Sequence, residues 1–223
     1  MTERSTKGIA PVASSHRRPR VRALSMVVAS VAATVGMALT ASFAPAGAAG
    51  GSAKSQLQTA VAAMQQVPGY TFTAAVGNGA GKVKITGEYQ APDRIHETVQ
   101  IGTQAPSEVV MVGTDVYAKN AAGAWQKAQP TGTTTSDLRT TFAALQQASG
   151  VKQSGKVVTF TLAPKAAASL VGAQATGKVK GRAKIANGRI TQLSYATKVN
   201  GQSVPVKITY TFPTPTPTVT APA

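Results

Sequence analysis

Cysteine is absent from this 223-residue sequence, which excludes disulfide bonds, thiolate chemistry, zinc–sulfur sites and a lipid-modified N-terminal cysteine. Histidine is nearly absent, since only two occur and His96 is the single one after the first 50 residues. Acidic residues are also scarce, with seven Asp and Glu against 23 Lys and Arg. No His pair and no acidic cluster has the spacing of metal ligands, so neither a metal site nor another cofactor is expected. No Gly-x-Ser-x-Gly motif occurs, and we do not expect an enzyme.

The first 48 residues have the order of a secretory signal peptide. Six basic residues precede an uncharged run over residues 23–43, and small residues over 44–48 end the segment. We expect cleavage after Ala48, with Ala46 as the second choice, and a mature chain in the cell envelope or outside the cell. The pair Arg17-Arg18 leaves twin-arginine export open, and the apolar run is long enough for an uncleaved anchor.

The charge that remains after this leader suggests what the protein contacts. The leader holds six of the basic residues and one of the acidic residues, so the mature chain carries a formal charge of +11. Such a charge favours anionic partners, such as an anionic membrane surface or a wall polymer, whereas export argues against nucleic acid. The alternative is that the charge only maintains solubility. We expect a monomer.

Strand-like alternation of apolar and polar residues dominates the mature chain. Between residues 82 and 127 it is interrupted by turn formers, which predicts an antiparallel meander of short strands. Further strands are predicted over 70–76, 158–162, 178–186, 189–197 and 204–212. Amphipathic helices are predicted over 55–66 and 136–148, with a short helical or irregular crossing over 164–171. In the second helix Ser136 is the expected N-cap, and Asp137 favours its positive end.

The pattern therefore predicts an α+β domain, with about ten antiparallel strands and two or three helices. The Pro- and Thr-rich residues 213–223 have no apolar periodicity, and we expect a disordered or polyproline tail there.

The register of the two strands around the turn at Ala91-Pro92-Asp93 follows from their apolar residues. If both apolar sets face one side, Ile85 lies opposite Val99 across a three-residue turn. The same register places Glu97 on the apolar face, opposite Gly87. It also places His96 across from Glu88 on the polar face, where an exposed pair is expected.

A large sheet with few, Ala-rich helices leaves room for an apolar hollow, although a filled core would give the same pattern. The order of export signal, amphipathic helix and strands reading VKITGEYQAPDRIHETVQIG, EVVMVGTDVYAK and GAWQK resembles the actinobacterial LppX/LprA/LprF/LprG-like lipoproteins, within the broader LolA-like superfamily. The resemblance covers most of residues 55–212. It is carried by Gly87, Pro92-Asp93-Arg94, Val112-Gly113, Val116-Tyr117 and Trp125-Gln126-Lys127.

The resemblance implies a curved, half-barrel antiparallel sheet closed by helices over an apolar cavity, within a domain spanning residues 49–212. It also implies binding and transport of lipids or lipidated molecules in the cell envelope. The missing lipobox cysteine departs from the lipoprotein pattern and suggests a soluble carrier. The alternatives are an exported structural or interaction module with a filled core, or an envelope-stress sensor domain.

Two sets of residues are candidates for the ligand site of such a carrier. Glu97 is a possible headgroup contact, unless a bulge or a cavity mouth returns its carboxylate to water. Tyr117 and Trp125 are placed at the mouth of the cavity, with ordinary sheet packing as the alternative. The apolar lining is expected from Val83, Ile85, Tyr89, Ile95, Val99, Ile101, Leu138, Phe142, Phe160, Ile208 and Tyr210.

Overall fold

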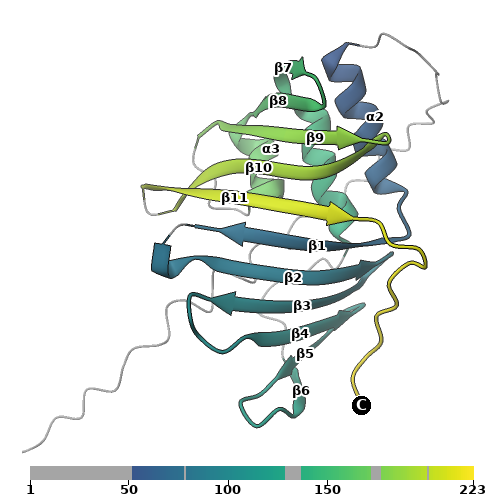
Figure 1. The fold of residues 1–223 in the computed structure, drawn as a ribbon, viewed down its shortest axis with the longest axis vertical. Helices are drawn as coiled ribbons and strands as arrows, with labels where there is room; N and C mark the ends of the chain where they lie inside the picture. The colour runs from purple at the N-terminus through teal and green to yellow at the C-terminus, as the bar shows by residue number, and fades with distance from the viewer. Residues whose placement is uncertain (1–51, 78, 129–136, 172–176, 200) are drawn as a thin grey trace, which may run out of the picture.

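The computed structural model describes residues 52–77, 79–128, 137–171, 177–199 and 201–223. The expected signal peptide lies outside the described residues. These residues form one sheet of eleven strands in the order β6-β5-β4-β3-β2-β1-β11-β10-β9-β8-β7, shown in Figure 1. Every neighbouring pair is antiparallel. Within the described part of the chain, no helix combines the length and apolar character needed to cross a bilayer.

The sheet consists of two meanders that meet where β1 pairs with β11. The first contains α2 (Ala53–Gln65), β1 (Gly69–Val76), η3 (Gly79–Gly81), β2 (Val83–Gln90), β3 (Arg94–Ile101), β4 (Ser107–Val112), β5 (Asp115–Lys119) and β6 (Trp125–Ala128). The second contains η4 (Leu138–Gln147), β7 (Ser149–Ser154), β8 (Val157–Leu162), α3 (Pro164–Val171), β9 (Val179–Ala186), β10 (Arg189–Val199) and β11 (Gln202–Thr211). The α+β class and the curved antiparallel sheet are confirmed.

The predicted register of β2 and β3 is confirmed. Ile85 lies opposite Val99, and Gly87 lies opposite Glu97. The pairing runs without a shift from Val83–Ile101 to Gln90–Arg94. Because side chains alternate between faces along a strand, this register fixes which residues share the face that carries Ile85 and Val99. That face is called the inner face below, and the opposite one the outer face.

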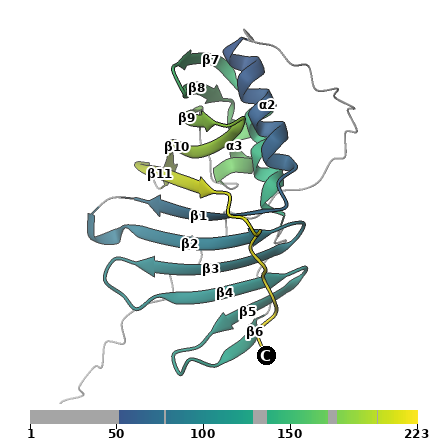
Figure 2. The same ribbon diagram turned by 45° about the vertical axis from the view of Figure 1, so that its right-hand side comes forward.

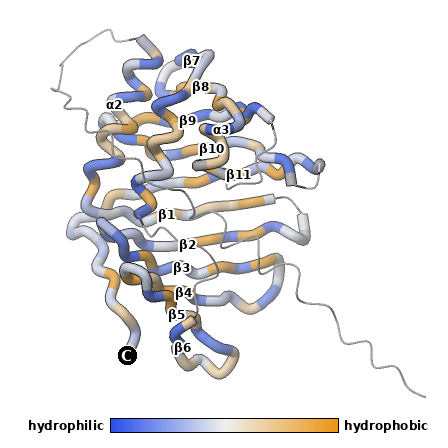
Figure 3. The backbone as a smooth tube through the Cα atoms, turned by 180° about the vertical axis from the view of Figure 1, so that it is seen from behind, coloured by the Kyte–Doolittle hydropathy of each residue, from blue (hydrophilic) through white to orange (hydrophobic). Residues whose placement is uncertain are grey.

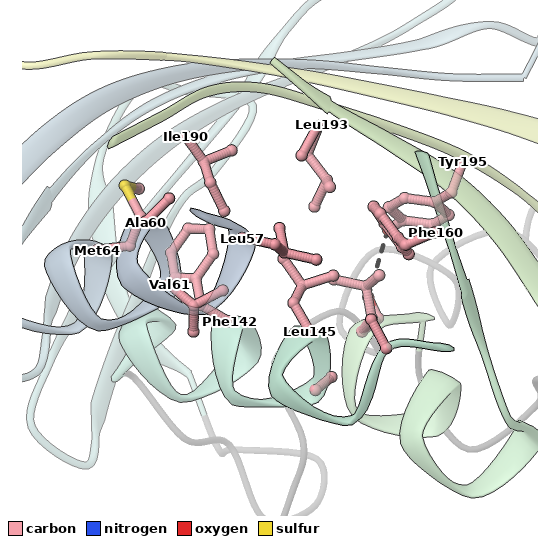
Figure 4. Close-up of a cluster of buried hydrophobic side chains, with 14 of the residues drawn as sticks. Leu57, Ala60, Val61, Met64, Phe142, Leu145, Phe160, Ile190, Leu193 and Tyr195 are labelled. Carbon is pink, nitrogen blue, oxygen red and sulfur yellow. Dashed lines mark hydrogen bonds between the residues drawn. The ribbon is translucent and has the colours of Figure 1, made fainter. Parts of the chain in front are cut away.

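The helices lie on the inner face, over one half of the sheet. They stand behind β8 to β11 in Figure 1, and in front of them in the reverse view of Figure 3. Figure 2 shows the same helices to one side of the sheet. The close-up in Figure 4 shows Leu57 and Val61 of α2 meeting Phe142 and Leu145 of η4 beneath Leu193 of β10. All five side chains are buried, so helices and sheet fill this space with protein.

The element after residue 137 differs from the amphipathic α-helix that the sequence predicts, because η4 is a 3-10 helix. Its N-cap is Asp137, whose side chain accepts from the backbone N–H of Arg139, whereas the expected cap Ser136 lies outside the described residues. The hydroxyls of Thr140 and Thr141 donate to carbonyls three residues earlier. Such local bonds by β-branched residues compete with the α-helical pattern and favour the tighter turn.

The C-terminal tail is a correction to the expectation of a disordered segment. It forms no helix or strand, but its Val219 is buried. The backbone N–H of Val219 donates to Gln90 Oε1 at 2.8 Å, and Arg94 Nη1 donates to the Val219 carbonyl at 3.0 Å. In Figure 2 the tail runs past the ends of the first strands. Prolines therefore leave the tail extended, while one apolar residue and two side-chain hydrogen bonds hold it to the sheet.

Candidate functional site

The inner face divides into a region covered by the described helices and a second region that these helices do not reach, which we call the open region, although its central side chains Ala74, Ile85 and Val99 are only 5–8% exposed. In the covered region, Leu57, Met64, Phe142, Leu145 and Leu193 belong to one continuous core under the helices. The open region is a second apolar cluster on β1, β2, β3 and β11. Figure 3 shows hydrophobic stretches of β1 to β3 beyond the described helices. The open region consists of the buried residues Ala74, Ile85 and Val99, with the partly buried Phe72, Val83, Ile101 and Ile208 packed against them.

The strand register brings the open region together. Ala74 of β1 lies opposite Ile85 on one side and Ile208 on the other, and Ile85 lies opposite Val99. These four side chains therefore form one row across four neighbouring strands, on the same face. Adjacent strands lie about 4.8 Å apart, so the row is roughly 14 Å long, which is comparable to a medium-length acyl chain.

Glu97 is the one carboxylate on the inner face of β2 to β4. It lies between Gly87 of β2 and Val109 of β4, with no bulge in either pairing. The expectation that a bulge returns it to water is therefore wrong. Glu97 has no hydrogen-bond or ion-pair partner among the described residues, and burial raises its pKa to about 7. Near neutral pH the group is thus poised between a neutral hydrogen-bond donor and a partly desolvated anion.

Gly87 makes room for an aromatic ring in this site. A Cβ atom at position 87 would lie 2.7 Å from a ring carbon of Phe72 and 2.8 Å from the carbonyl oxygen of His96. The ring of Phe72 therefore lies directly over Gly87 of β2, whose cross-strand neighbour on β3 is Glu97. The same device recurs in the covered region, where the ring of Phe160 lies over Gly181.

A hydrogen-bonded group marks the border between the two regions. The hydroxyl of Tyr89 lies 2.7 Å from Asp137 Oδ1 and 2.9 Å from the Pro92 carbonyl. Burial, and then the bond to Asp137, raises the pKa of Tyr89 well above its usual range. Burial acts to raise the pKa of Asp137 too, but hydrogen bonds from Arg139 and Tyr89 outweigh it and lower this pKa. The group fastens the start of η4 to β2.

The eleven residues expected to line one cavity fall into two groups. Val83, Ile85, Val99, Ile101 and Ile208 meet in the open region. Tyr89, Ile95, Phe142, Phe160 and Tyr210 are buried in the core under the helices, and Leu138 packs against that core. The space around the second group is filled by protein, because side chains of α2 and η4 pack in the same buried cluster. Alternation along the strands finds the shared face, but it does not indicate how far the helices reach.

Tyr117 and Trp125 do not lie at the mouth of an inner-face cavity. Register places Tyr117 opposite Val110, and Trp125 opposite Lys119, on the outer face. Lys119 Nζ lies 5.5 Å from the Trp125 ring centre and 2.9 Å from Glu108 Oε1. Lys119 is charged and is therefore expected on the outer face. Alternation along β5 then places Tyr117 on the same face, and pairing with Lys119 places Trp125 there as well.

His96 lies across from Glu88 on the outer face, as the register predicted. Its Nε2 atom instead lies 3.6 Å from Oε2 of Glu108 on β4. Glu108 lies diagonally across from His96 on β4, and the register of β2 with β3 alone gives no information about β4.

The comparisons with known proteins agree with this architecture. No protein-family model matches the sequence, and no curated protein matches it. Among solved structures, LprF from Mycobacterium bovis aligns with 77% of this chain and 97% of that chain, with a TM-score of 0.56 at 14% identity. The lipoprotein LppX from Mycobacterium tuberculosis aligns with 75% of this chain and 98% of that chain, with a TM-score of 0.54 at 11% identity. The chain therefore shares the LolA-like half-barrel fold of these structures.

Proposed function

We propose that this protein is an exported carrier of the cell envelope that holds the acyl chains of a lipid or glycolipid against the open region. The observation that carries the proposal is the continuous row Ala74, Ile85, Val99 and Ile208, which lies on the inner face beyond the helix-filled core. The LolA-like fold supports it, because the sequence resemblance implies lipid binding for this class of half-barrel.

The affinity of such a site would come from apolar area. Each methylene removed from water contributes about 0.8 kcal/mol, so contact with eight to ten methylenes supplies roughly 6–8 kcal/mol before the cost of immobilisation. Binding by area depends little on the detailed headgroup. A carrier of this kind accepts several related lipids, which suits a role in transport.

Glu97 would contact the polar end of the ligand. It borders the open region, and no hydrogen bond or ion pair joins it to another described residue. With a pKa raised to about 7, the protonated group donates a hydrogen bond to an ester or amide carbonyl at mildly acidic pH. Ligand binding should then weaken as the pH rises through 7.

The protein would act outside the cytoplasm, in the cell envelope. Residues 1–48 would direct export and be removed, leaving a mature protein without a lipobox cysteine. This mature chain, residues 49–223, contains every element that the structure describes.

The experiment compares two pairs of substitutions on the same strands. Ile85→Ser with Val99→Ser removes apolar area from the open region, whereas Lys84→Ser with Gln100→Ser changes their exposed or half-buried neighbours on the outer face. Residues 49–223 are purified without detergent, and native mass spectrometry and a fluorescent fatty acid report bound lipid. We expect lipid on the wild type and the outer-face pair, and a loss of affinity of about tenfold or more for the inner-face pair.

Thermal unfolding separates binding from folding in this experiment. If the inner-face pair lowers stability too far, Glu97→Gln provides a milder second variant, in which the loss of fatty-acid binding as the pH rises through 7 should be smaller than in the wild type. Wild-type protein that is free of lipid and takes up no fluorescent fatty acid would overturn the carrier and favour the structural module.

A further inference from the structure

The positive charge of the mature chain is concentrated in its second half. Asp137 is the last acidic residue of the sequence, and eleven Lys and Arg residues follow it. Residues 49–137 hold six basic and six acidic residues, so the whole excess comes from the part that builds η4, β7 to β11 and α3. Of the eleven, Arg139 alone takes part in an ion pair within the described residues.

Strand register aligns part of this charge in a straight line on the outer face. Arg182 lies opposite Thr159 on one side and Ser194 on the other, and Ser194 lies opposite Lys207. The line continues from Thr159 to Lys152 and from Lys207 through Ala75 to Lys84. We call Lys152, Arg182, Lys207 and Lys84 the cationic row.

The row has a regular spacing. Its members stand on β7, β9, β11 and β2, which are alternate strands of the sheet in Figure 1. With about 4.8 Å between strands, successive cations are about 10 Å apart and the row is roughly 29 Å long. Thr159, Ser194 and Ala75 occupy the strands between them. All four cations are exposed, and none has an ion-pair partner in the described part of the chain.

A hollow of about 650 Å³ lies along the middle of the row. Arg182 and Lys207 line it together with two more exposed cations, Lys180 and Lys82. Its lining includes the hydroxyl residues Thr159, Thr161 and Ser194. The aromatic residues of the lining, Phe160 and Tyr195, alternate with these outward-facing residues and belong to the buried core on the other side.

We propose that this outer face binds a linear polymer with regularly spaced phosphodiester charges, lying across the strands along the cationic row. Lysine and arginine, helped by Ser and Thr hydroxyls, are the side chains that contact phosphate oxygens. A chain can enter the hollow and reach successive cations, while its uncharged units lie over Thr159, Ser194 and Ala75.

The surface is less suited to two other polyanions. A bilayer surface is flat, and its binding proteins insert Trp, Phe or Leu, whereas the outward-facing apolar lining here is limited to Ala75, Ala196 and Pro205. Single-stranded nucleic acid is usually held by exposed aromatic side chains that stack on bases, and none faces outward in this lining. The proposal concerns the face opposite the open region, so it does not depend on lipid binding.

The test uses the binding of the mature protein to fluorescently labelled poly(glycerol phosphate), measured by anisotropy at several salt concentrations. Arg182→Glu with Lys207→Glu reverses the centre of the row. Lys54→Glu with Lys165→Glu makes the same change of charge at exposed positions on helices α2 and α3, on the other side of the sheet. We expect a loss of affinity of about tenfold or more for the row variant and of less than about threefold for the helix variant at about 0.1 M salt.

The salt dependence and the competing ligands complete the test. The slope of log affinity against log salt concentration should fall by about 1.5 in the row variant, which loses two cations, and remain unchanged in the helix variant. If circular dichroism shows that the reversal variant of the row is unfolded, Arg182→Gln with Lys207→Gln replaces it. This neutral variant should also bind the polymer more weakly than the helix variant does. Equal losses in the two reversal variants, or an absence of polymer binding, would overturn the proposal. So would tighter binding to phosphatidylglycerol vesicles, to polygalacturonate or to single-stranded DNA.

Discussion

Gly87 and Glu97 face each other across β2 and β3 on the inner face, where the ring of Phe72 lies over the glycine. The missing side chain at position 87 admits the ring. Burial raises the pKa of Glu97, the cross-strand neighbour of Gly87, to about 7.

The stability of the protein should depend on the pH through Glu97. The pKa in the folded state, about 7, is higher than the ordinary value of 4.5, so the folded state binds the proton more tightly. The stabilising contribution is complete below about pH 4.5 and is lost as the pH rises through 7. Because the side chain keeps some contact with solvent, we expect Glu97→Gln to stabilise the protein by about 2 kcal/mol at pH 8, and by much less at pH 4.5. Thermal melts at the two pH values measure this, and an equal effect at both would contradict it.

Gly87→Ala should destabilise the protein, because the new methyl group would overlap the ring of Phe72 and approach the backbone of His96. We expect a loss of about 1–3 kcal/mol in urea unfolding, which is the usual range for an overpacked position. Gly81→Ala is the matched control, since a Cβ atom at Gly81 meets no atom within 4 Å. If the two variants have the same midpoint, Phe72 does not lie where the structure places it.

Tyr89→Phe tests the attachment of η4 to the sheet. The substitution keeps the buried ring and removes the hydroxyl that lies between Asp137 and the Pro92 carbonyl. We expect a loss of about 1–2 kcal/mol, together with faster hydrogen exchange in η4. Tyr117→Phe is the control, because its hydroxyl lies on the outer face at 3.5 Å from Asp115. A loss of stability without faster exchange in η4 would show that the bond does not hold this element.

Removal of the tail after Phe212 should leave the sheet intact and lower its stability. The truncation exposes the surface that buries Val219 and removes its hydrogen bonds to Gln90 and Arg94. Burial of one valine and two net hydrogen bonds suggest a loss of about 2–3 kcal/mol, or roughly 5–10 °C in the melting temperature. Val219→Ser in the full chain should reproduce part of the loss, whereas Thr220→Ser, at an exposed neighbour, should not. An unchanged melting temperature after truncation would contradict the contacts.

The sequence predicted the sheet because most of its strands alternate clearly. Ile85, Val99 and the turn at Pro92 determine one register, and only that register buries both apolar sets. β7 was missed, because Ser149–Ser154 is an edge strand with mostly exposed polar side chains and no alternation. The tail was misjudged for a related reason, since a single buried residue such as Val219 produces no periodic pattern.

The candidate site was predictable only in part. Alternation places Ile85, Val99 and Glu97 on one face, but the extent of the helix layer decides which apolar residues remain outside the core. That extent depends on how η4 is fastened by the Tyr89–Asp137 contact, between residues 48 positions apart. Nothing local in the sequence reports such a contact. The cationic row likewise depends on six strand pairings, none of which is the predicted pairing of β2 with β3.

The most direct measurement of the central claim is photo-crosslinking with a fatty acid that carries a diazirine on its acyl chain. Residues 49–223 are loaded with it and irradiated, and mass spectrometry of the peptides locates the labelled positions. We predict labelling concentrated on β1, β2 and β3, at residues of the open region such as Ile85 and Val99, with competition by unlabelled fatty acid. Labelling that is spread over the outer face, confined to the helices, or insensitive to competition would contradict acyl binding at the open region.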